Sequence, residues 1–444
     1  MSRLFGTDGI RGVANVDLQP SLAFALGRAT ARRLAGPGRA LVVGQDTRRS
    51  GDMFVAAIAA GATSLGAEVH LAGVVPTPAL AYIAGEDDFA GAIMVSASHN
   101  PAADNGLKVL DDRGMKLDDT VEDELESLIW RADELGGVPA DAVGRVHDRS
   151  AELRERYVGH RSGLAGRIRT GLHVVLDCAN GSGSFVASGI LEATGARVDT
   201  IHAAPDGSNI NLGCGATAPA SLAAEVVARG ADIGFALDGD ADRCVAVDAA
   251  GRVVDGDQLI GLLALERIGR GALPGGLVVV TVLSNGGLGA AIEAVGGSLI
   301  RTPVGDKYIL EGMIVSGSGL GGEKSGHVIV REHSTSGDGI LTALEVLRTV
   351  TEAGAPLADL AGRIRLFPQE QRAVHVRHKE QWVGEPEILR AIATAEARLG
   401  PAGRVLVRPS GTEAALRVMV EGSDAALVTE LADAIAALAE ERLH

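Results

Sequence analysis

The stretch "ALVVGQDTR" at residues 40–48 has the pattern of a buried strand followed by a polar loop, and it opens a plan that the chain repeats. "LHVVLDCANGSG" at 172–183 and "GLVVVTVLSNGG" at 276–287 begin in the same way. In each copy a helix-like stretch follows, ends at a glycine and leads into a second strand; the glycines are Gly66, Gly195 and Gly296. Glycine suits the end of a helix because it adopts the left-handed conformation freely. The sequence therefore predicts a threefold strand–helix–strand repeat.

Apolar strands that alternate with helices predict sheets covered on both faces. The C-terminal part differs, since "RAVHVR" (372–377) and "RVLVRP" (404–409) alternate like half-exposed strands, and "LRVMVEG" (416–422) can pair back on the second of them. We expect an α/β protein with three related α/β domains of mixed sheets and a smaller C-terminal α+β domain. The predicted domains span residues 1–148, 149–251, 252–365 and 366–444.

Composition excludes several classes of function. The 444 residues carry a formal net charge of −16, which gives no general attraction to nucleic acid or to an anionic membrane. The three cysteines form no Cys-x-x-Cys pair, so a disulfide framework is not expected. No apolar run approaches the length of a membrane span, and the N-terminus lacks the apolar core of a signal peptide. We expect a cytoplasmic protein.

The segment "IMVSASHNPAADNGLKV" at 93–109 runs from an apolar strand directly into polar residues. Ser96 and Ser98 are both candidate nucleophiles. In an extended segment their side chains point to the same side, so spacing alone does not choose between them.

Three carboxylates follow a later apolar run in "LDGDADRCVAVD" at 237–248. Asp238, Asp240 and Asp242 alternate along the chain and repel one another unless a cation neutralises them. Hard oxygen ligands at this density suit Mg²⁺. The alternative is a solvated acidic turn. Arg243, next in sequence, offers a contact of opposite sign to a phosphate.

"VRPSGTEAALRV" at 407–418 joins two predicted strands near the C-terminus. Small residues allow backbone N–H groups to point at an anion, and an arginine on each side supplies charge-assisted hydrogen bonds. The alternative is a polar hairpin turn with ordinary surface arginines. The candidate phosphate ligands are Arg408, Ser410, Gly411, Thr412 and Arg417.

Three more segments carry candidate residues: "FGTDGIRGVAN" (5–15), "TPVGDKYIL" (302–310) and "GGEKSGHVIV" (321–330). Glutamate and serine in the last segment are suited to sugar hydroxyls, and a histidine there can transfer a proton near neutral pH. A histidine at the start of a strand is, however, more often structural than catalytic. The candidate residues are Arg11, Asp306, Lys307, Glu323, Ser325 and His327.

Taken together, these segments resemble the α-D-phosphohexomutase family. Four motifs stand in the family's order: "SASHNP" (96–101), "DGDADR" (238–243), "GEKSGH" (322–327) and "RPSGTE" (408–413). The resemblance covers essentially the whole chain and implies four domains around a central cleft. It also implies phosphoryl transfer within a sugar phosphate.

The resemblance also implies residue roles. Ser98 is expected to carry the transferable phosphoryl group and, with the three aspartates, to bind one Mg²⁺ per chain. Lys108 and His327 are expected near the transferring proton, and Arg11 is counted with them as catalytic. The expected substrate-binding residues are Arg243, Asp306, Lys307, Glu323, Ser325, Arg408, Ser410, Gly411, Thr412 and Arg417.

The opening "FGTDGIRGVAN" is most similar to the branch that interconverts glucosamine 6-phosphate and glucosamine 1-phosphate for UDP-N-acetylglucosamine synthesis. The expected route passes through a phosphoserine, with glucosamine or glucose 1,6-bisphosphate as intermediate and activator. Lys324 departs from that branch, which usually has Gln there. The alternatives are a phosphoglucomutase or phosphomannomutase of the same family, a Mg²⁺-dependent sugar phosphatase and a non-catalytic sugar-phosphate sensor. A homodimer is a further expectation from the family.

Overall fold

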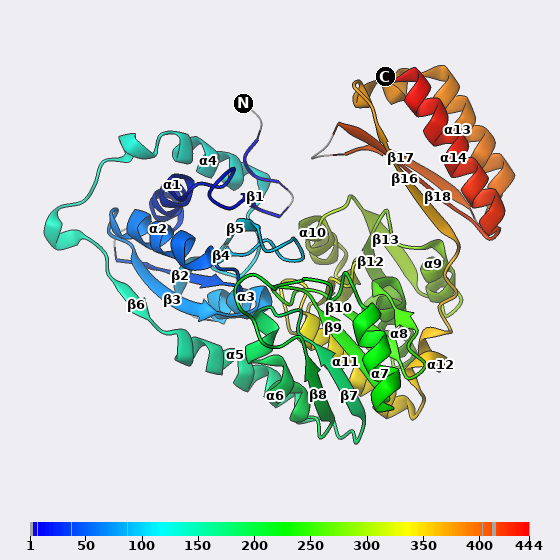
Figure 1. Ribbon diagram of the computed structural model, residues 1–444, viewed down its shortest axis with the longest axis horizontal. Coiled ribbons are helices and arrows are strands. Elements are labelled where there is room, and N and C mark those ends of the chain that lie inside the picture. Colours follow the sequence, from blue (N-terminus) through cyan, green and yellow to red (C-terminus); the bar gives the residue numbers. More distant parts are fainter. Residues whose placement is uncertain are drawn as a thin grey trace. The chain divides into compact units, whose positions relative to one another are not determined.

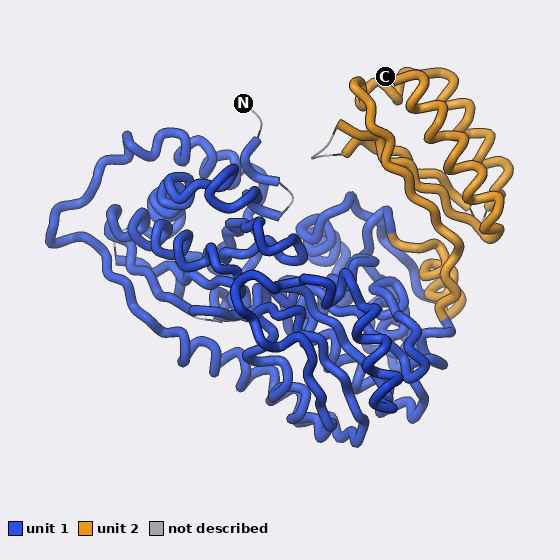
Figure 2. The backbone as a smooth tube through the Cα atoms, viewed as in Figure 1, with its two compact units in different colours: residues 1–283, 297–363 blue, residues 284–296, 364–444 orange. Residues whose placement is uncertain are grey.

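The computed structural model describes residues 3–6, 8–36, 38–86, 88–401, 403–410 and 414–443. The chain divides into two compact units (Figure 2): residues 1–283 with 297–363, and residues 284–296 with 364–444. The described residues form three mixed sheets and one smaller antiparallel sheet. This arrangement confirms the predicted fold class of three related α/β parts and a C-terminal α+β part.

The three mixed sheets share one topology. Each contains a set of four strands that follow one another in the sequence. The first strand pairs in parallel with the second and with the third, and the third pairs in antiparallel fashion with the fourth. The first set is β2 (Ala40–Gln45), β3 (Glu68–Val74), β4 (Phe89–Val95) and β5 (Asp104–Leu110). The second set is β7 (His173–Asp177), β8 (Arg197–Ile201), β9 (Ile233–Leu237) and β10 (Cys244–Asp248). The third set is β12 (Leu277–Thr281), β13 (Ser298–Thr302), β14 (Leu320–Gly322) and β15 (Val328–Val330).

Three edge strands complete the sheets: β1 (Ile10–Val13), β6 (Val146–Asp148) and β11 (Val253–Val254). Helices α1 and α2 lie on one side of the first sheet and α3 on the other (Figure 1). The helices up to the second sheet are α1 (Pro20–Thr30), α2 (Gly51–Thr63), α3 (Thr77–Glu86), α4 (Asp119–Trp130), α5 (Ser150–Ala165), α6 (Ala187–Glu192) and α7 (Ala220–Arg229). Those that follow are α8 (Gly256–Gly269), α9 (Gly286–Glu293), α10 (Asp306–Ser316), α11 (Gly339–Ala353) and α12 (Leu357–Ala361).

The predicted glycine at the end of each repeated helix has the expected conformation. Gly66, Gly195 and Gly296 have φ of +83°, +87° and +82°. Each lies three residues beyond the last helical residue, and its N–H donates to the carbonyl oxygen of that residue. The helices therefore end earlier than predicted, and one further turn separates each helix from its glycine.

The second unit contains the antiparallel sheet β16-β18-β17, and α13 and α14 pack on one face of it (Figure 1). Its elements are β16 (Gln369–His375), α13 (Pro386–Leu399), β17 (Arg404–Pro409), β18 (Ala415–Glu421) and α14 (Ala425–Arg442). The predicted pairing of the last two strands is confirmed. Among the described helices, none has both the length and the apolarity that crossing a membrane requires.

A fully buried ion pair joins α5 to the start of α11. The Arg161 guanidinium donates to Asp338, with Nε and Oδ2 3.0 Å apart, and the Tyr157 hydroxyl donates to the same carboxylate. Asp338 also caps α11 by accepting from the Leu341 N–H. Removal of the arginine leaves this carboxylate buried without its counter-charge, which costs far more than the loss of an exposed pair.

Arg161→Met is therefore expected to lower the free energy of unfolding by about 3–5 kcal/mol. Arg156→Met is a matched control on the same helix, because the Arg156 pair with Glu152 is solvent-exposed; its expected cost is below about 1 kcal/mol. Urea denaturation followed by circular dichroism measures both. Equal effects of the two substitutions would contradict the prediction.

Candidate active site

Three of the predicted motifs occupy the same place in the repeated topology. Each follows the third strand of its set, in the connection to the antiparallel fourth strand: residues 96–103 after β4, 238–243 after β9 and 323–327 after β14. The fourth motif begins at Arg408, within β17 of the second unit. The repeat therefore places one polar loop on each of the three mixed sheets.

Ser98 has an unusual backbone. Its φ is +52°, a conformation that costs energy for a residue with a side chain, and the residue is almost fully buried. Its hydroxyl donates to Asp238, with Oγ and Oδ2 2.6 Å apart. The loop that carries Ser98 is thus bent so that the hydroxyl meets the acidic loop.

Ser96 has a different function in the same loop. Its hydroxyl donates to Asp46 Oδ2 at 2.6 Å and accepts from the backbone N–H of Ser98 at 2.9 Å. Both hydrogen bonds support the loop, and of the two serine hydroxyls only that of Ser98 is bonded to the acidic triad. The geometry favours Ser98 as the reacting serine, a choice that spacing alone did not allow.

The three aspartates of the acidic loop can hold a metal ion. A carboxylate oxygen from each of Asp238, Asp240 and Asp242 lies within 4.8 Å of the others, and all three residues are buried. Oδ1 of Asp240 and Oδ1 of Asp242 are buried and have no hydrogen-bond partner within the described residues. Burial, followed by the neighbouring Asp242 and Asp240, raises the pKa of Asp238 well above its usual range. Unpaired buried carboxylate oxygens are the donors that a hard divalent cation takes.

Lys108, on β5, extends into the same cluster. Its Nζ lies 2.9 Å from Asp240 Oδ2, 3.2 Å from Asp8 Oδ2 and 3.8 Å from Asp242 Oδ2. Burial lowers its pKa, but the carboxylates of Asp240, Asp8 and Asp242 outweigh burial and raise the pKa above its ordinary value. Lys108 was predicted as a candidate for proton transfer; these contacts favour a fixed positive charge instead.

His327 is buried between carboxylates. Nδ1 lies 3.6 Å from Asp242 Oδ2, and Nε2 lies 3.6 Å from Asp306 Oδ2. Burial lowers the pKa of His327, but the nearby carboxylates, with that of Glu323, raise it to about 9. The backbone N–H of Gly337 donates to Nε2 at 2.9 Å, which opposes a proton on that nitrogen. In the neutral ring this hydrogen bond leaves the proton on Nδ1, toward Asp242.

A cavity of about 190 Å³ opens beside these groups. Six of the residues predicted for the site line it: Arg11, Asp242, Arg243, Asp306, Glu323 and His327. His99 also lines it. Burial, with Arg243 and Arg11 next, lowers the pKa of His99 to about 4, so this ring is neutral at pH 7. The Ser325 hydroxyl, another predicted site group, donates to Glu323 Oε2 at 3.1 Å.

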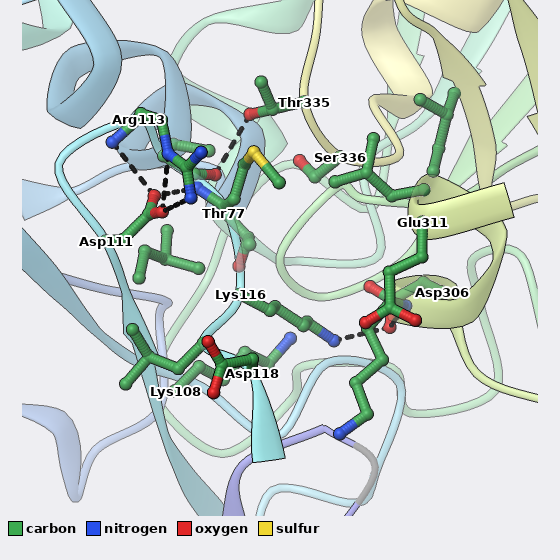
Figure 3. A pocket seen from close by; sticks show the side chains of 18 of the residues that line it. Thr77, Lys108, Asp111, Arg113, Lys116, Asp118, Asp306, Glu311, Thr335 and Ser336 are labelled. Atoms are coloured by element: carbon green, nitrogen blue, oxygen red, sulfur yellow. Dashed lines mark hydrogen bonds and ion pairs between the residues drawn. The ribbon is translucent and has the colours of Figure 1, made fainter. Parts of the chain in front are cut away.

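The Lys307 side chain is held by carboxylates of α4. Its ammonium group contacts Asp119 and lies 3.7 Å from Glu122 Oε2, both on α4. It lines a second cavity of about 350 Å³, which Figure 3 shows from close by. In that view Lys116 reaches toward Asp306, and their Nζ and Oδ1 are 2.7 Å apart.

The predicted phosphate-binding residues of the second unit are described in part. Arg408 and Arg417 are directly opposite each other on β17 and β18, and burial together with Arg417 lowers the pKa of Arg408. Ser410 is buried, and its N–H donates to the carbonyl oxygen of Ala415. Gly411 and Thr412 lie outside the described residues.

Sequence reasoning missed residues that support the reacting loop. The fully buried Arg48 donates to the carbonyl oxygens of Ser98, Asn100, Pro101 and Asp104. Asp46 orients both Arg48 and Ser96. Lys116 bridges Asp8 and Asp306. The signal in the sequence for Asp46 and Arg48 was the "DTR" at 46–48. It directly follows the first repeated strand, and polar residues after a buried strand are often functional.

Gly239 occupies the point where the acidic loop meets the serine loop. A Cβ at this position would lie 2.6 Å from the Ser98 carbonyl oxygen and 2.9 Å from Asn211 Nδ2. Backbone atoms cannot move away cheaply, so Gly239→Ala is expected to shift Ser98 relative to Asp238. We expect kcat to fall by about 10²-fold, because a misplacement of 1 Å costs that much.

Gly163→Ala is the matched control for this substitution. Gly163 lies in α5, where an added Cβ would meet no atom within 4 Å beyond the helix's own backbone, so the variant should retain activity and gain up to about 1 kcal/mol of stability. Steady-state kinetics and thermal unfolding measure both variants. An unchanged kcat for Gly239→Ala would show that the close approach of the two loops is not required.

Comparison with known proteins defines the class. Four models of the phosphoglucomutase/phosphomannomutase family match successive parts of the chain: domain I at residues 2–136, domain II at 155–251, domain III at 255–367 and the C-terminal domain at 373–438. The chain belongs to this family of phosphohexomutases and is an isomerase of that class.

Its curated relatives narrow the class further. The chain is 50% identical over 427 residues to a phosphoglucosamine mutase of Moorella thermoacetica, covering 96% of both chains. It is 48% identical to that of Symbiobacterium thermophilum over the full length of both chains. The predicted family and the phosphoglucosamine mutase branch are thereby confirmed.

Solved structures agree with the fold. A phosphoglucomutase/phosphomannomutase family protein from Burkholderia thailandensis matches with a TM-score of 0.83 at 25% identity, over 100% of this chain and 99% of that one. An N-acetylphosphoglucosamine mutase from Aspergillus fumigatus, solved with GlcNAc-6P and magnesium, matches with a TM-score of 0.71 at 18% identity. It covers 99% of this chain and 95% of that one, and supports the fold alone.

Proposed function

We propose that the protein interconverts glucosamine 6-phosphate and glucosamine 1-phosphate, with Ser98 as the phosphoryl carrier. The observation that carries this proposal is the Ser98 hydroxyl, which lies 2.6 Å from Asp238 inside a buried acidic triad. A serine placed among carboxylates is a poor phosphoryl site unless a cation is also bound there. Glucosamine is proposed as the sugar because the relatives described above are named phosphoglucosamine mutases.

The residues present fit one Mg²⁺, with Ser98, Asp238, Asp240 and Asp242 as its ligands. Two buried carboxylate oxygens without hydrogen-bond partners support this set. When bound, the ion neutralises charge on the transferring phosphoryl group. The Aspergillus fumigatus protein of the same fold was solved with magnesium and GlcNAc-6P, and we propose a bound Mg²⁺ and a hexosamine phosphate substrate for this chain too.

In the first half of the reaction, phosphorylated Ser98 gives its phosphoryl group to the free hydroxyl of the sugar phosphate. The bond from phosphorus to Ser98 Oγ breaks as the bond to the sugar oxygen forms. The sugar hydroxyl proton passes to a base, and Ser98 Oγ finally accepts a proton. We propose His327 for proton transfer, because it lines the cavity of about 190 Å³, and Lys108 as a fixed charge.

Catalysis of this kind rests on positioning and on compensation of charge. Arg11 and Arg243 line the cavity and are proposed to contact the phosphoryl oxygens. Glu323 and Ser325 are proposed to hold sugar hydroxyls. Asp306, which lines the cavity and pairs with Lys116, is also proposed to bind substrate. Lys307 is proposed to bind substrate only if its contacts with α4 are exchanged.

The second half of the reaction requires the hexosamine 1,6-bisphosphate to present its other phosphate to Ser98. A site that does this must also hold the phosphate that is not reacting. We propose Arg408, Ser410 and Arg417, with Gly411 and Thr412, as the ligands of that phosphate. The same bisphosphate, or glucose 1,6-bisphosphate, would serve as activator by phosphorylating Ser98.

One assay tests the function: rates on glucosamine, glucose and mannose 6-phosphates with one preparation, Mg²⁺ and a trace of 1,6-bisphosphate. We expect the highest kcat/KM with glucosamine 6-phosphate. A preference for glucose or mannose phosphate would identify another branch of the family. Release of inorganic phosphate would indicate a phosphatase, and binding without turnover would indicate a sensor.

Several expectations from the sequence remain proposals. We propose four domains spanning residues 1–148, 149–251, 252–365 and 366–444, a cytoplasmic location and no nucleic-acid partner. We also propose a homodimer, which sedimentation measurements on the purified protein would test.

A further inference from the structure

The loop that carries Ser98 has two carbonyl groups that each accept two side-chain donors. The Ser98 carbonyl oxygen accepts from Arg48 NH2 at 2.9 Å and from Asn211 Nδ2 at 2.9 Å. The Asn100 carbonyl oxygen accepts from the same two groups, at 2.7 and 3.1 Å. A carbonyl oxygen has two lone pairs, so both carbonyls are fully used.

The two donors come from different parts of the chain. Arg48 follows β2 and so belongs to the same sheet as the serine loop, whereas Asn211 precedes α7 and belongs to the part that carries the acidic loop. Arg48 can therefore hold the shape of the loop. Asn211 can hold the position of the loop relative to the aspartates.

Asn211 is itself firmly placed. Its φ is +58°, and its N–H donates to the Ala179 carbonyl oxygen at 2.9 Å. Four residues later, the Gly215 N–H donates to the fully buried Asp177 at the end of β7. Strand β7 pairs with β9, and the acidic loop follows β9. The Asn211 amide is thus tied to the sheet that supplies Asp238.

The contacts around Gly239 also place the Asn211 amide between the serine loop and the acidic loop. The position of its absent Cβ would lie within 3 Å of both the Ser98 carbonyl oxygen and Asn211 Nδ2. The serine loop, the asparagine amide and the acidic loop therefore meet at one point. A shift of the asparagine side chain changes the support of Ser98 at the place where the loop faces Asp238.

We propose that Asn211 is a positioning residue that sets the Ser98 loop against the acidic triad, an inference that rests on the proposed role of Ser98. The amide donates to two carbonyls at once and thereby fixes both the position and the tilt of the strained turn. Its loss leaves Arg48 to hold the loop shape, but the distance from Ser98 Oγ to Asp238 is no longer controlled from the acidic side.

The test variant is Asn211→Gly, because glycine adopts the positive φ without steric strain and lacks the side-chain amide. We expect kcat to fall by about 10–100-fold, with KM changed less than about threefold, since the phosphoryl group is misplaced while substrate contacts remain. Hydrogen–deuterium exchange of a peptide covering residues 96–104 should become faster.

Two controls separate positioning from general stability. Asn15→Gly makes the same change at another asparagine of positive φ whose side chain is exposed. Thr47→Val removes a hydrogen bond from Thr47 to the Asn180 carbonyl oxygen, which joins the same two parts of the chain without reaching the Ser98 carbonyl. Both should keep kcat within about threefold of the parent and leave exchange of the 96–104 peptide unchanged.

The outcomes distinguish this inference from the proposed function. If Asn211→Gly matches the controls in both kcat and exchange, the positioning role is wrong. If Thr47→Val lowers kcat as much as Asn211→Gly, docking of the two parts accounts for the effect and the inference is also wrong. If the parent protein turns over none of the three hexose phosphates, the proposed function fails, and the exchange of the 96–104 peptide still decides whether Asn211 holds the loop.

Discussion

Ser98→Ala is expected to lower kcat of the isomerisation by at least about 10⁴-fold, the scale on which loss of a catalytic nucleophile acts. Alanine removes the only atom through which residue 98 can carry a phosphoryl group. Among the described residues, the hydroxyl meets His99 Nδ1 and donates to Asp238, so its loss should leave the fold intact. Steady-state kinetics measures the loss. Incubation with 1,6-bisphosphate followed by phosphopeptide mass spectrometry shows whether residues 93–109 still take up phosphate.

Ser96→Ala is the control that separates the two candidate serines. The Ser96 hydroxyl joins Asp46 to the Ser98 N–H, so its loss leaves two buried groups short of a hydrogen bond, at a cost of about 1–3 kcal/mol. We expect a reduction in kcat of about 10–100-fold with phosphorylation retained. Full activity of Ser98→Ala, or loss of phosphorylation only in Ser96→Ala, would reverse the assignment.

The threefold repeat could be predicted because it depends on local patterns. Apolar runs specified the strands, and glycines at matching places specified the turns after the helices. The sequence did not show that each third strand turns back to an antiparallel partner. That pairing depends on contacts between strands, which no periodicity within β4 or β9 records.

The candidate site was predictable where a motif carries its own chemistry, as in the three aspartates. The choice between Ser96 and Ser98 could not be predicted from spacing. Spacing assumes an extended chain, and the φ of +52° at Ser98 breaks the regular alternation of side chains. Arg48 and Asn211 lie 50 and 113 residues from Ser98 in the chain, and no local pattern pairs them with it. The motif around Lys307 predicted a substrate-binding residue. It could not predict the contact of Lys307 with α4, which lies far away in the sequence.

Asp240→Asn is expected to lower kcat by about 10³-fold, near the upper end of the range for loss of one electrostatic group at a reacting centre. Asparagine keeps the size of the side chain and removes the charge of a proposed metal ligand. It also weakens the pair between Oδ2 and Lys108, at 2.9 Å. The Mg²⁺ concentration that gives half-maximal activity should rise at least about tenfold. Chelation with EDTA should abolish the activity of the parent protein, and Mg²⁺ should restore it.

The same substitution should have little effect on the stability of the metal-free protein, and this separates its role in catalysis from a role in folding. Loss of one negative charge relieves the repulsion that Asp240 exerts on Asp238, while Lys108 keeps Asp8 at 3.2 Å. The relief of repulsion raises the free energy of unfolding, and the weaker pair with Lys108 lowers it, so the two changes largely cancel. Asp123→Asn, on the exposed face of α4, is the control and should change neither the Mg²⁺ dependence nor kcat. An unaltered Mg²⁺ dependence in Asp240→Asn would exclude this carboxylate as a ligand, whereas a large loss of metal-free stability would assign it to holding Lys108 in the fold.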